Sequence, residues 1–210
     1  MTTLARSERA SLCETALQVG EDRPTLCAGW TVKDLVVHLL VREGSPAALG
    51  IMVAPLAGLT AAESRRVGRR DFVDLVARLR SGPPRLSPFA IPKLDELGNS
   101  LELFIHHEDI RRAQPDWVAR TLGDDAERTL WPMVRSLGRR LAKPAPVGVR
   151  IEDSATGSTA ELTRGDDAVT VRGLPSELAL FLFGRGPQAR VDLVGSGDAV
   201  ARLRAAPLGA

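Results

Sequence analysis

The sequence predicts an α+β protein in which a helical bundle is followed by a small domain of strands and helices. From residue 3 to about 142, apolar residues recur at intervals of three and four, which is the helical period. After "KPAPVG" apolar and polar residues alternate, which is the strand period. We therefore place a helical domain at residues 1–143 and an α+β domain at residues 144–210.

Five helices are expected before the change of period, and Pro or Gly clusters mark their ends. Thr31 should cap the second, because its hydroxyl can accept from the amide of Asp34 while that carboxylate reaches back. "GSP" at 44–46 breaks or kinks this helix, and Pro92 is a favourable first-turn residue for the fourth. The expected ranges are 3–19, from 31 onward, 69–80, 92–114 and 124–142.

The second domain is expected to contain three strands, a short helix, a fourth strand and a terminal helix. Gly and Asp turn residues separate the strands, and Ser196 or Asp198 should cap the last helix. In that order the expected ranges are 147–153, 158–165, 168–173, 174–185, 189–195 and 196–206.

Composition restricts the compartment and the partners. The 210 residues are 44% hydrophobic and 26% charged, the balance of a globular protein with a core. The start "MTTLARSERASLCETAL" lacks a signal-peptide core, and no run reaches the roughly 18 apolar residues that a membrane span requires. The expectation is a cytoplasmic monomer or homodimer without a membrane partner.

Nucleic acid is not an expected partner. The net charge is only +2, aromatic residues make up 4% and tyrosine is absent, so stacking platforms are scarce. Arginines in "ESRRVGRRDF" and at Arg111 and Arg112 are candidates for binding carboxylates, although a solvated helix face explains both groups more simply.

The three histidines lie in two helical segments, and two of those histidines can share a site with a carboxylate. Glu102 and His106 are four residues apart, so they lie on one face of a helix. If the second and fourth helices are neighbours, His38 can meet them. Two nitrogens and one oxygen suit Zn²⁺ and leave a coordination position open, as in catalytic zinc sites. Ordinary packing is the competing interpretation, but burying Glu102 unpaired would cost several kcal/mol, which a divalent cation offsets.

Neighbouring residues allow further roles. His107 points about 100° away from His106; a surface position is its simpler interpretation, and a proton shuttle is the alternative. Asp109 can orient the imidazole of His106 as a hydrogen-bond acceptor. Cys27 can approach the metal, but the apolar neighbours Leu26 and Trp30 favour a packed thiol.

Two motifs carry a family resemblance. "LCAGWTVKDLVVHLLVRE" and the later "LELFIHHEDIRRAQ" resemble the DinB-like superfamily, in particular the branch of mycothiol-dependent maleylpyruvate isomerases. "APVGVRIED" and "GLPSELALFLFGR" resemble the carboxy-terminal domain of that branch. The resemblance implies a four-helix bundle that holds a divalent metal, usually zinc, through His38, Glu102 and His106.

The resemblance also implies a chemistry. We expect a metal-dependent isomerase or S-transferase that uses mycothiol or a similar thiol on a small electrophile. The alternative is a non-catalytic metal-binding protein, or a module that binds a small ligand or partner in its α+β domain, where Leu178, Phe181, Leu182 and Phe183 can line a pocket.

Overall fold

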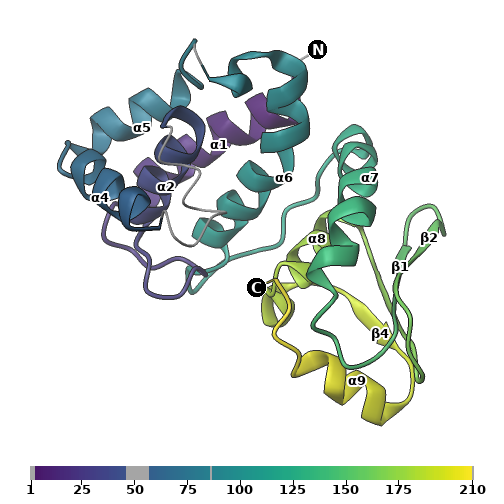
Figure 1. Ribbon diagram of the computed structural model, residues 1–210. Coiled ribbons are helices and arrows are strands. Elements are labelled where there is room, and N and C mark those ends of the chain that lie inside the picture. The colour runs from purple at the N-terminus through teal and green to yellow at the C-terminus, as the bar shows by residue number, and fades with distance from the viewer. Residues whose placement is uncertain (1–2, 46–56, 86, 210) are drawn as a thin grey trace. The chain divides into compact units, whose positions relative to one another are not determined.

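The chain folds into two compact units, Met1–Ala119 and Arg120–Ala210. The computed structural model describes residues 3–45, 57–85 and 87–209 (Figure 1). The first unit is helical, and the second combines helices with a four-stranded sheet. The predicted α+β class is confirmed.

Within its described residues, the helical unit is a bundle formed by α1, α2, α4, α5 and α6. α1 packs along α6 and against α5, and α2 packs against α5 and α4 (Figure 1). The helix α4 is not among the predicted ones. The elements are α1 (Leu4–Val19), α2 (Val32–Gly44), α4 (Ala57–Gly68), α5 (Phe72–Arg80), the short 3₁₀ helix η3 (Pro88–Ala90) and α6 (Pro92–Arg111).

Local sequence signals set several of the helix ends. The Thr31 side chain accepts from the amide of Asp34, and the Asp34 carboxylate accepts from the amide of Thr31, so the predicted capping box is present. The third predicted helix was placed too early, because Asp71 caps α5 and fixes its start at Phe72. α2 ends at Gly44 with Ser45 as its cap, and the rest of the "GSP" signal lies outside the described residues.

Apolar side chains from α1, α2, α4, α5 and α6 form the core of this unit. Fully buried leucines come from α1 (Leu12), α2 (Leu35, Leu39) and α5 (Leu75, Leu79). Burial of each such side chain contributes roughly 1.5–3 kcal/mol. The core holds α2 in the orientation from which His38, between Leu35 and Leu39 in sequence, faces the site described below.

The second unit is built on a mixed sheet of order β2-β1-β3-β4. β1 pairs antiparallel with β2 and parallel with β3, and β4 pairs antiparallel with β3. Ser196 caps the last helix through the amide of Ala199. The elements are α7 (Asp124–Leu141), β1 (Val149–Asp153), β2 (Thr159–Thr163), β3 (Val169–Gly173), α8 (Pro175–Leu182), the 3₁₀ helix η4 (Gly186–Gln188), β4 (Asp192–Val194) and α9 (Gly197–Arg204).

The units divide before α7, earlier than the 143/144 boundary placed from the sequence. α7 packs against α8 and β2, so it belongs to the unit that contains the sheet. Periodicity reports the secondary structure of a segment but not the partner against which its apolar face packs, which is why the two boundaries differ. Among the described helices, none combines the length and the apolar character that crossing a membrane requires.

A buried carboxylate fixes α7 to the start of α8. Leu174 precedes α8 and has no side-chain oxygen to cap it, whereas Glu127 of α7 accepts from the amide of Ser176 at 2.9 Å and from its hydroxyl at 2.7 Å. Burial raises the pKa of Glu127, although these two bonds oppose the shift. The hydrogen bonds of Glu127 therefore stabilise the start of α8, although burial disfavours the negative charge of this carboxylate.

The raised pKa predicts a pH-dependent stability. Because the pKa of Glu127 is higher in the folded protein than in the unfolded chain, its contribution is fully present below the unfolded value of about 4.3 and is lost as pH rises through the folded value. Urea unfolding at a series of pH values should show a smaller loss in Glu127→Gln than in the unsubstituted protein. Glu161→Gln, at an exposed position of β2, is the control and should keep the original slope. Identical slopes for Glu127→Gln and the unsubstituted protein would contradict this assignment.

Candidate metal centre

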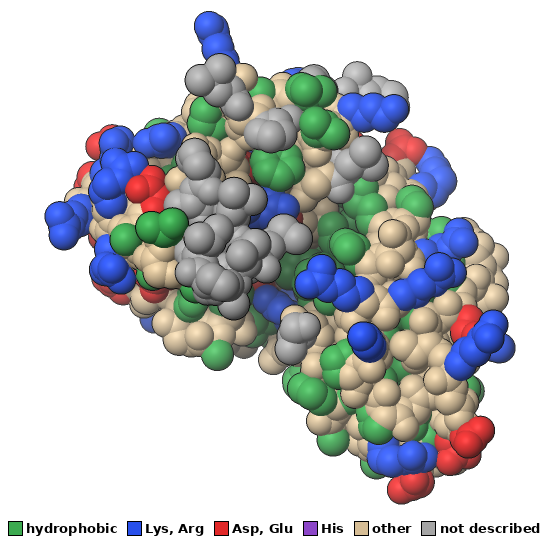
Figure 2. Space-filling model, viewed as in Figure 1, with side chains coloured by type: hydrophobic (Ala, Val, Ile, Leu, Met, Phe, Trp, Pro, Cys, Tyr) green, Lys and Arg blue, Asp and Glu red, His purple; other side chains and the backbone are tan. Residues whose placement is uncertain are grey.

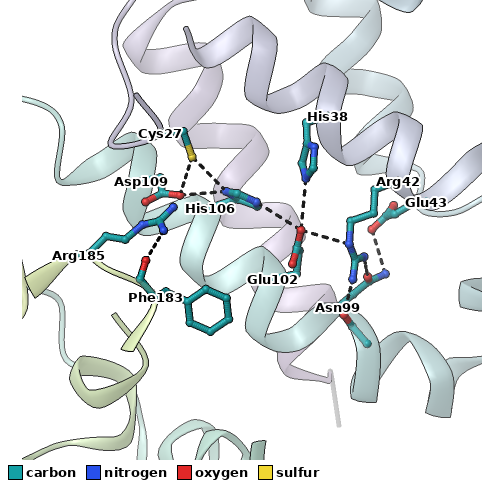
Figure 3. Close-up of polar contacts among 11 residues, drawn as sticks. Cys27, His38, Arg42, Glu43, Asn99, Glu102, His106, Asp109, Phe183 and Arg185 are labelled. Atoms are coloured by element: carbon teal, nitrogen blue, oxygen red, sulfur yellow. Dashed lines mark hydrogen bonds and ion pairs between the residues drawn. The ribbon is translucent and has the colours of Figure 1, made fainter. Parts of the chain in front are cut away.

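Two imidazoles, from two helices, converge on one carboxylate oxygen. His38 of α2 and His106 of α6 each place Nε2 3.4 Å from Oε1 of Glu102 (Figure 3). The centroids of the two imidazole rings are 5.3 Å apart. The structure thus brings together the three residues that the sequence selects.

Local geometry explains the convergence. Glu102 and His106 occupy successive turns of α6, which aligns their side chains on one face. His38 lies on α2, where the capping box at Thr31 fixes the helix start and the indole of Trp30 lies 5.0 Å from the His38 ring. The side chains of His38, Glu102 and His106 are 17%, 23% and 11% exposed, so solvent can still reach the site.

Asp109 holds the second nitrogen of His106. Its Oδ2 lies 3.0 Å from Nδ1 of the imidazole, and Asp109 is fully buried. When Nδ1 donates its proton to this carboxylate, the lone pair of Nε2 faces Glu102, as a metal ligand requires. The orienting contact expected from the sequence is present.

The charges in the cluster are mutually stabilised. Burial alone would raise the pKa of Glu102, but the hydrogen bonds with His106 and His38 hold it well below its ordinary value. Burial acts to lower the pKa of His106, yet its hydrogen bonds with Asp109, Cys27 and Glu102 hold it well above its ordinary value. A cation bound between these groups would take over the role of the imidazole proton, so binding would release that proton.

The donor set fits a divalent metal. One atom of each side chain, two nitrogens and one carboxylate oxygen, lies within 4.8 Å of the other two. Three such ligands match the protein contribution to catalytic zinc sites, in which a further position remains for water or substrate. His38, Glu102 and His106 could therefore hold a metal together.

Arg42 is a member of the site that the sequence interpretation missed. Its Nε lies 3.2 Å from the same Oε1 of Glu102, its Nη2 donates to the carbonyl of Gly98 at 2.9 Å and its Nη1 donates to Asn99 (Figure 3). The guanidinium also covers the ring of Phe89, with Cζ 5.1 Å from the centroid. Arg42 follows His38 by four residues, and this spacing is the signal that could have placed it on the same face.

A buried ionic network continues from Asn99 toward α1. The amide of Asn99 donates to Glu43 at 3.0 Å and to Asp95 at 2.8 Å. Arg9 of α1 pairs with the same two carboxylates, at 2.6 Å to Glu43 and 3.0 Å to Asp95. These four side chains are all buried, so charges on three helices are fixed relative to Glu102.

Two expectations for neighbouring residues are wrong. His107 is buried rather than on the surface, with Nδ1 3.0 Å from Glu8 and Nε2 2.9 Å from Thr15. Both of its nitrogens thus engage α1, which favours a packing role over the proton shuttle. Arg112 does not lie on a solvated face, because it is buried and its Nε pairs with Glu108 at 2.5 Å.

A cleft of about 920 Å³ opens beside His38, between α2 and α4. The exposed side chains of Arg65 and Arg69 contribute to its lining, and Lys33 lies on the α2 side. Figure 2 shows that Lys and Arg side chains gather on the surface over α4. Basic side chains at a cleft favour small anionic molecules such as carboxylates.

The fold and the site define a class: an α+β protein whose helical bundle holds a histidine–carboxylate centre beside a basic cleft. Residues 3–88 match the family model described as "Mycothiol maleylpyruvate isomerase N-terminal domain", and His38 lies within this range. For residues 3–88, the match confirms the resemblance to the mycothiol-dependent maleylpyruvate isomerases that the motif around His38 predicts.

Solved structures support the same fold over nearly the whole chain. A histidine-to-alanine mutant of mycothiol-dependent maleylpyruvate isomerase matches with a TM-score of 0.60, and another crystal structure of mycothiol-dependent maleylpyruvate isomerase matches with 0.53. Each match has 18% sequence identity and covers 92% of this chain and 95% of the other. No functionally curated protein matches the chain.

The buried network predicts a large stability loss when Arg9 is removed. Arg9→Met would leave Glu43 and Asp95 buried without their main counter-charge, so we expect the free energy of unfolding to fall by about 3–5 kcal/mol in urea denaturation. Arg66→Met is the control, because it removes an exposed pair with Glu63 and should leave stability nearly unchanged. Similar losses in the two variants would refute the distinction.

Proposed function

We propose that the protein is a metal-dependent enzyme that uses a low-molecular-weight thiol, such as mycothiol, to isomerise a small electrophile or to transfer the thiol to it. The observation that carries this proposal is the convergence of His38, Glu102 and His106 in a unit of which residues 3–88 match the isomerase N-terminal domain. Zinc is the metal that the donor set favours. A cytoplasmic location and a monomeric or dimeric state remain predictions from the sequence.

The proposed ligand residues have distinct tasks. His38, Glu102 and His106 would hold the cation, Asp109 would keep Nε2 of His106 directed at it, and Arg42 holds the Glu102 carboxylate in place. A zinc ion bound there would act as a Lewis acid that lowers the pKa of a thiol, so that a thiolate nucleophile would be available at neutral pH. Partial burial of the three ligands limits competition from water.

The proposed isomerisation and thiol transfer require no oxidant or reductant. The thiolate sulfur adds to one carbon of a conjugated double bond, and the electron pair moves to the activating carbonyl group. After rotation about the new single bond, expulsion of the thiolate restores the double bond and completes an isomerisation. Uptake of a proton instead leaves the thioether, which is the transfer product.

The basic cleft provides a place for the anionic end of a substrate or thiol. Arg65 and Arg69 line it from α4, and His38 lies at its α2 side, so a carboxylate held by the arginines would lie near the cluster. Maleylpyruvate, named in the matching family, is a small carboxylate that fits this description.

A non-catalytic carrier is the second candidate, and a hollow in the α+β unit favours it. Phe181 lines a cavity of about 420 Å³ together with Leu193, Leu203 and Leu208. Leu178 and Leu182, also proposed from the sequence as pocket residues, are buried in the core. A thiol-dependent rate separates the two candidates, because a carrier would show none.

Loss of His38 should abolish the activity. With zinc, thiol and maleylpyruvate or another small enoate, we expect His38→Ala to reduce the thiol-dependent rate by at least about 100-fold, since one of three ligands is lost. Arg66→Ala, exposed on α4 and outside the cleft lining, is the control and should retain the rate. Turnover that survives in His38→Ala would reject the proposed mechanism.

Removal of the cleft arginines should affect substrate binding more than the chemical step. We expect Arg65→Ala and Arg69→Ala each to raise KM for a carboxylate substrate by about tenfold, with a smaller change in kcat, because the lost interaction is made before and during reaction. Steady-state kinetics with Arg66→Ala as reference would measure this effect. An unchanged KM in both variants would show that the substrate lies elsewhere.

A further inference from the structure

A second group of metal-binding side chains lies on the opposite side of the His106 ring. Cys27 places Sγ 3.2 Å from Oδ2 of Asp109 and 3.9 Å from Nδ1 of His106, and this nitrogen lies 3.0 Å from the same Oδ2 (Figure 3). A sulfur, a nitrogen and a carboxylate oxygen thus lie within 4.8 Å of one another. The group is distinct from the His38 cluster, which uses Nε2 of His106.

Hydrogen bonds fix the loop that carries Cys27 to α6 and to the segment that follows α6. The amide of Leu26 donates to the carbonyl of Asp109 at 3.0 Å, and the side chain of Gln114 donates to the carbonyl of Pro24 at 3.1 Å. The carbonyl of Cys27 accepts from the amide of Trp30 at 2.9 Å. These contacts hold Cys27 beside Asp109. Its apolar sequence neighbours predicted a thiol in apolar packing, but the thiol donates to the Asp109 carboxylate.

We propose that Cys27, Asp109 and Nδ1 of His106 form a second metal-binding position for a thiophilic divalent cation such as Zn²⁺, Co²⁺ or Cd²⁺. Tetrahedral zinc with bonds of about 2.0–2.1 Å to N and O and about 2.3 Å to S separates its ligands by roughly 3.3–3.6 Å. The observed separations of 3.0, 3.2 and 3.9 Å reach these values through shifts of a few tenths of an ångström.

The charges and donor types favour a soft cation at this position. A thiolate and a carboxylate together offset two positive charges, and thiolate ligation selects for thiophilic metals over Mg²⁺ or Ca²⁺. On binding, the thiol of Cys27 and Nδ1 of His106 each release a proton to solvent. A neutral imidazole then carries its remaining proton on Nε2, so this position competes with the His38 cluster for His106.

Cobalt substitution tests the proposal independently of catalysis. His38→Ala disables the first cluster but leaves Cys27, His106 and Asp109 in place, so Co²⁺ bound to this variant should show sulfur-to-cobalt charge-transfer absorption in the near ultraviolet. We expect Cys27→Ser in the same background to lose this absorption and to weaken Co²⁺ binding by about 100-fold. Cys13→Ser is the matched control, because Cys13 is buried beside α5 and should not alter the spectrum.

Alkylation of the unsubstituted protein provides a second test, which does not depend on the folding of any variant. Burial raises the pKa of Cys13 to about 11, so iodoacetamide near pH 8 should modify Cys27 first. Saturating Cd²⁺ should slow modification of Cys27 by at least about tenfold, because a coordinated thiolate is a poor nucleophile. Absence of the charge-transfer band in His38→Ala, its persistence after Cys27→Ser, or an alkylation rate unaffected by Cd²⁺ would overturn the proposal. None of these outcomes depends on whether the protein catalyses thiol transfer.

Discussion

The structure of the helical unit depends on one partly buried negative charge, the carboxylate of Glu102. Taking an ionised carboxylate out of water costs several kcal/mol unless partners compensate for the lost hydration. Here His38, His106 and Arg42 all approach the same oxygen, from α2 and from α6. The side chains that meet at this oxygen therefore do two things at once: they stabilise the contact between the two helices, and they prepare a site in which a cation can replace part of the positive charge.

The contacts around Arg42 explain why this arrangement is rigid. Gly98 has no side chain, and a Cβ there would meet the Phe89 ring at 2.6 Å, so the glycine allows the ring to approach α6 and support the guanidinium. Arg42 then reaches the Gly98 carbonyl and Asn99, and Asn99 connects it to the network of Glu43, Asp95 and Arg9. The carboxylate at the centre is thus oriented through α6, α2 and α1 together. Removal of one charged member leaves the others buried and unpaired, whereas exposed pairs on α4 have water as an alternative partner.

The sequence predicts those features that depend on local spacing. The three-residue spacing of Thr31 and Asp34 predicts the capping box, and the four-residue spacing of Glu102 and His106 predicts a shared helical face.

Features that depend on tertiary contact were missed. Arginines are usually solvated, so the sequence alone suggests surface positions for Arg9 and Arg112. Both are buried in the structure, where carboxylates pair with them. The surface expectation for His107 failed for the same reason, since Glu8 lies 99 positions earlier. α7 has a clear helical period, but only packing reveals that it lies against α8 and β2 of the second unit.

The two ring nitrogens of His106 belong to different clusters, and this links the protonation of one cluster to that of the other. A neutral imidazole carries one proton, and the position of that proton decides which nitrogen can bind a cation. While Nδ1 donates to Asp109, Nε2 is available to the His38 and Glu102 side; when a thiophilic cation occupies the Cys27 side, the proton must move to Nε2 or be lost. Asp109 is fully buried and contacts both Cys27 and His106, so its charge influences both states. The same carboxylate that orients His106 for one cluster is a ligand in the other, and which of the two clusters holds a cation therefore determines the function of the ring.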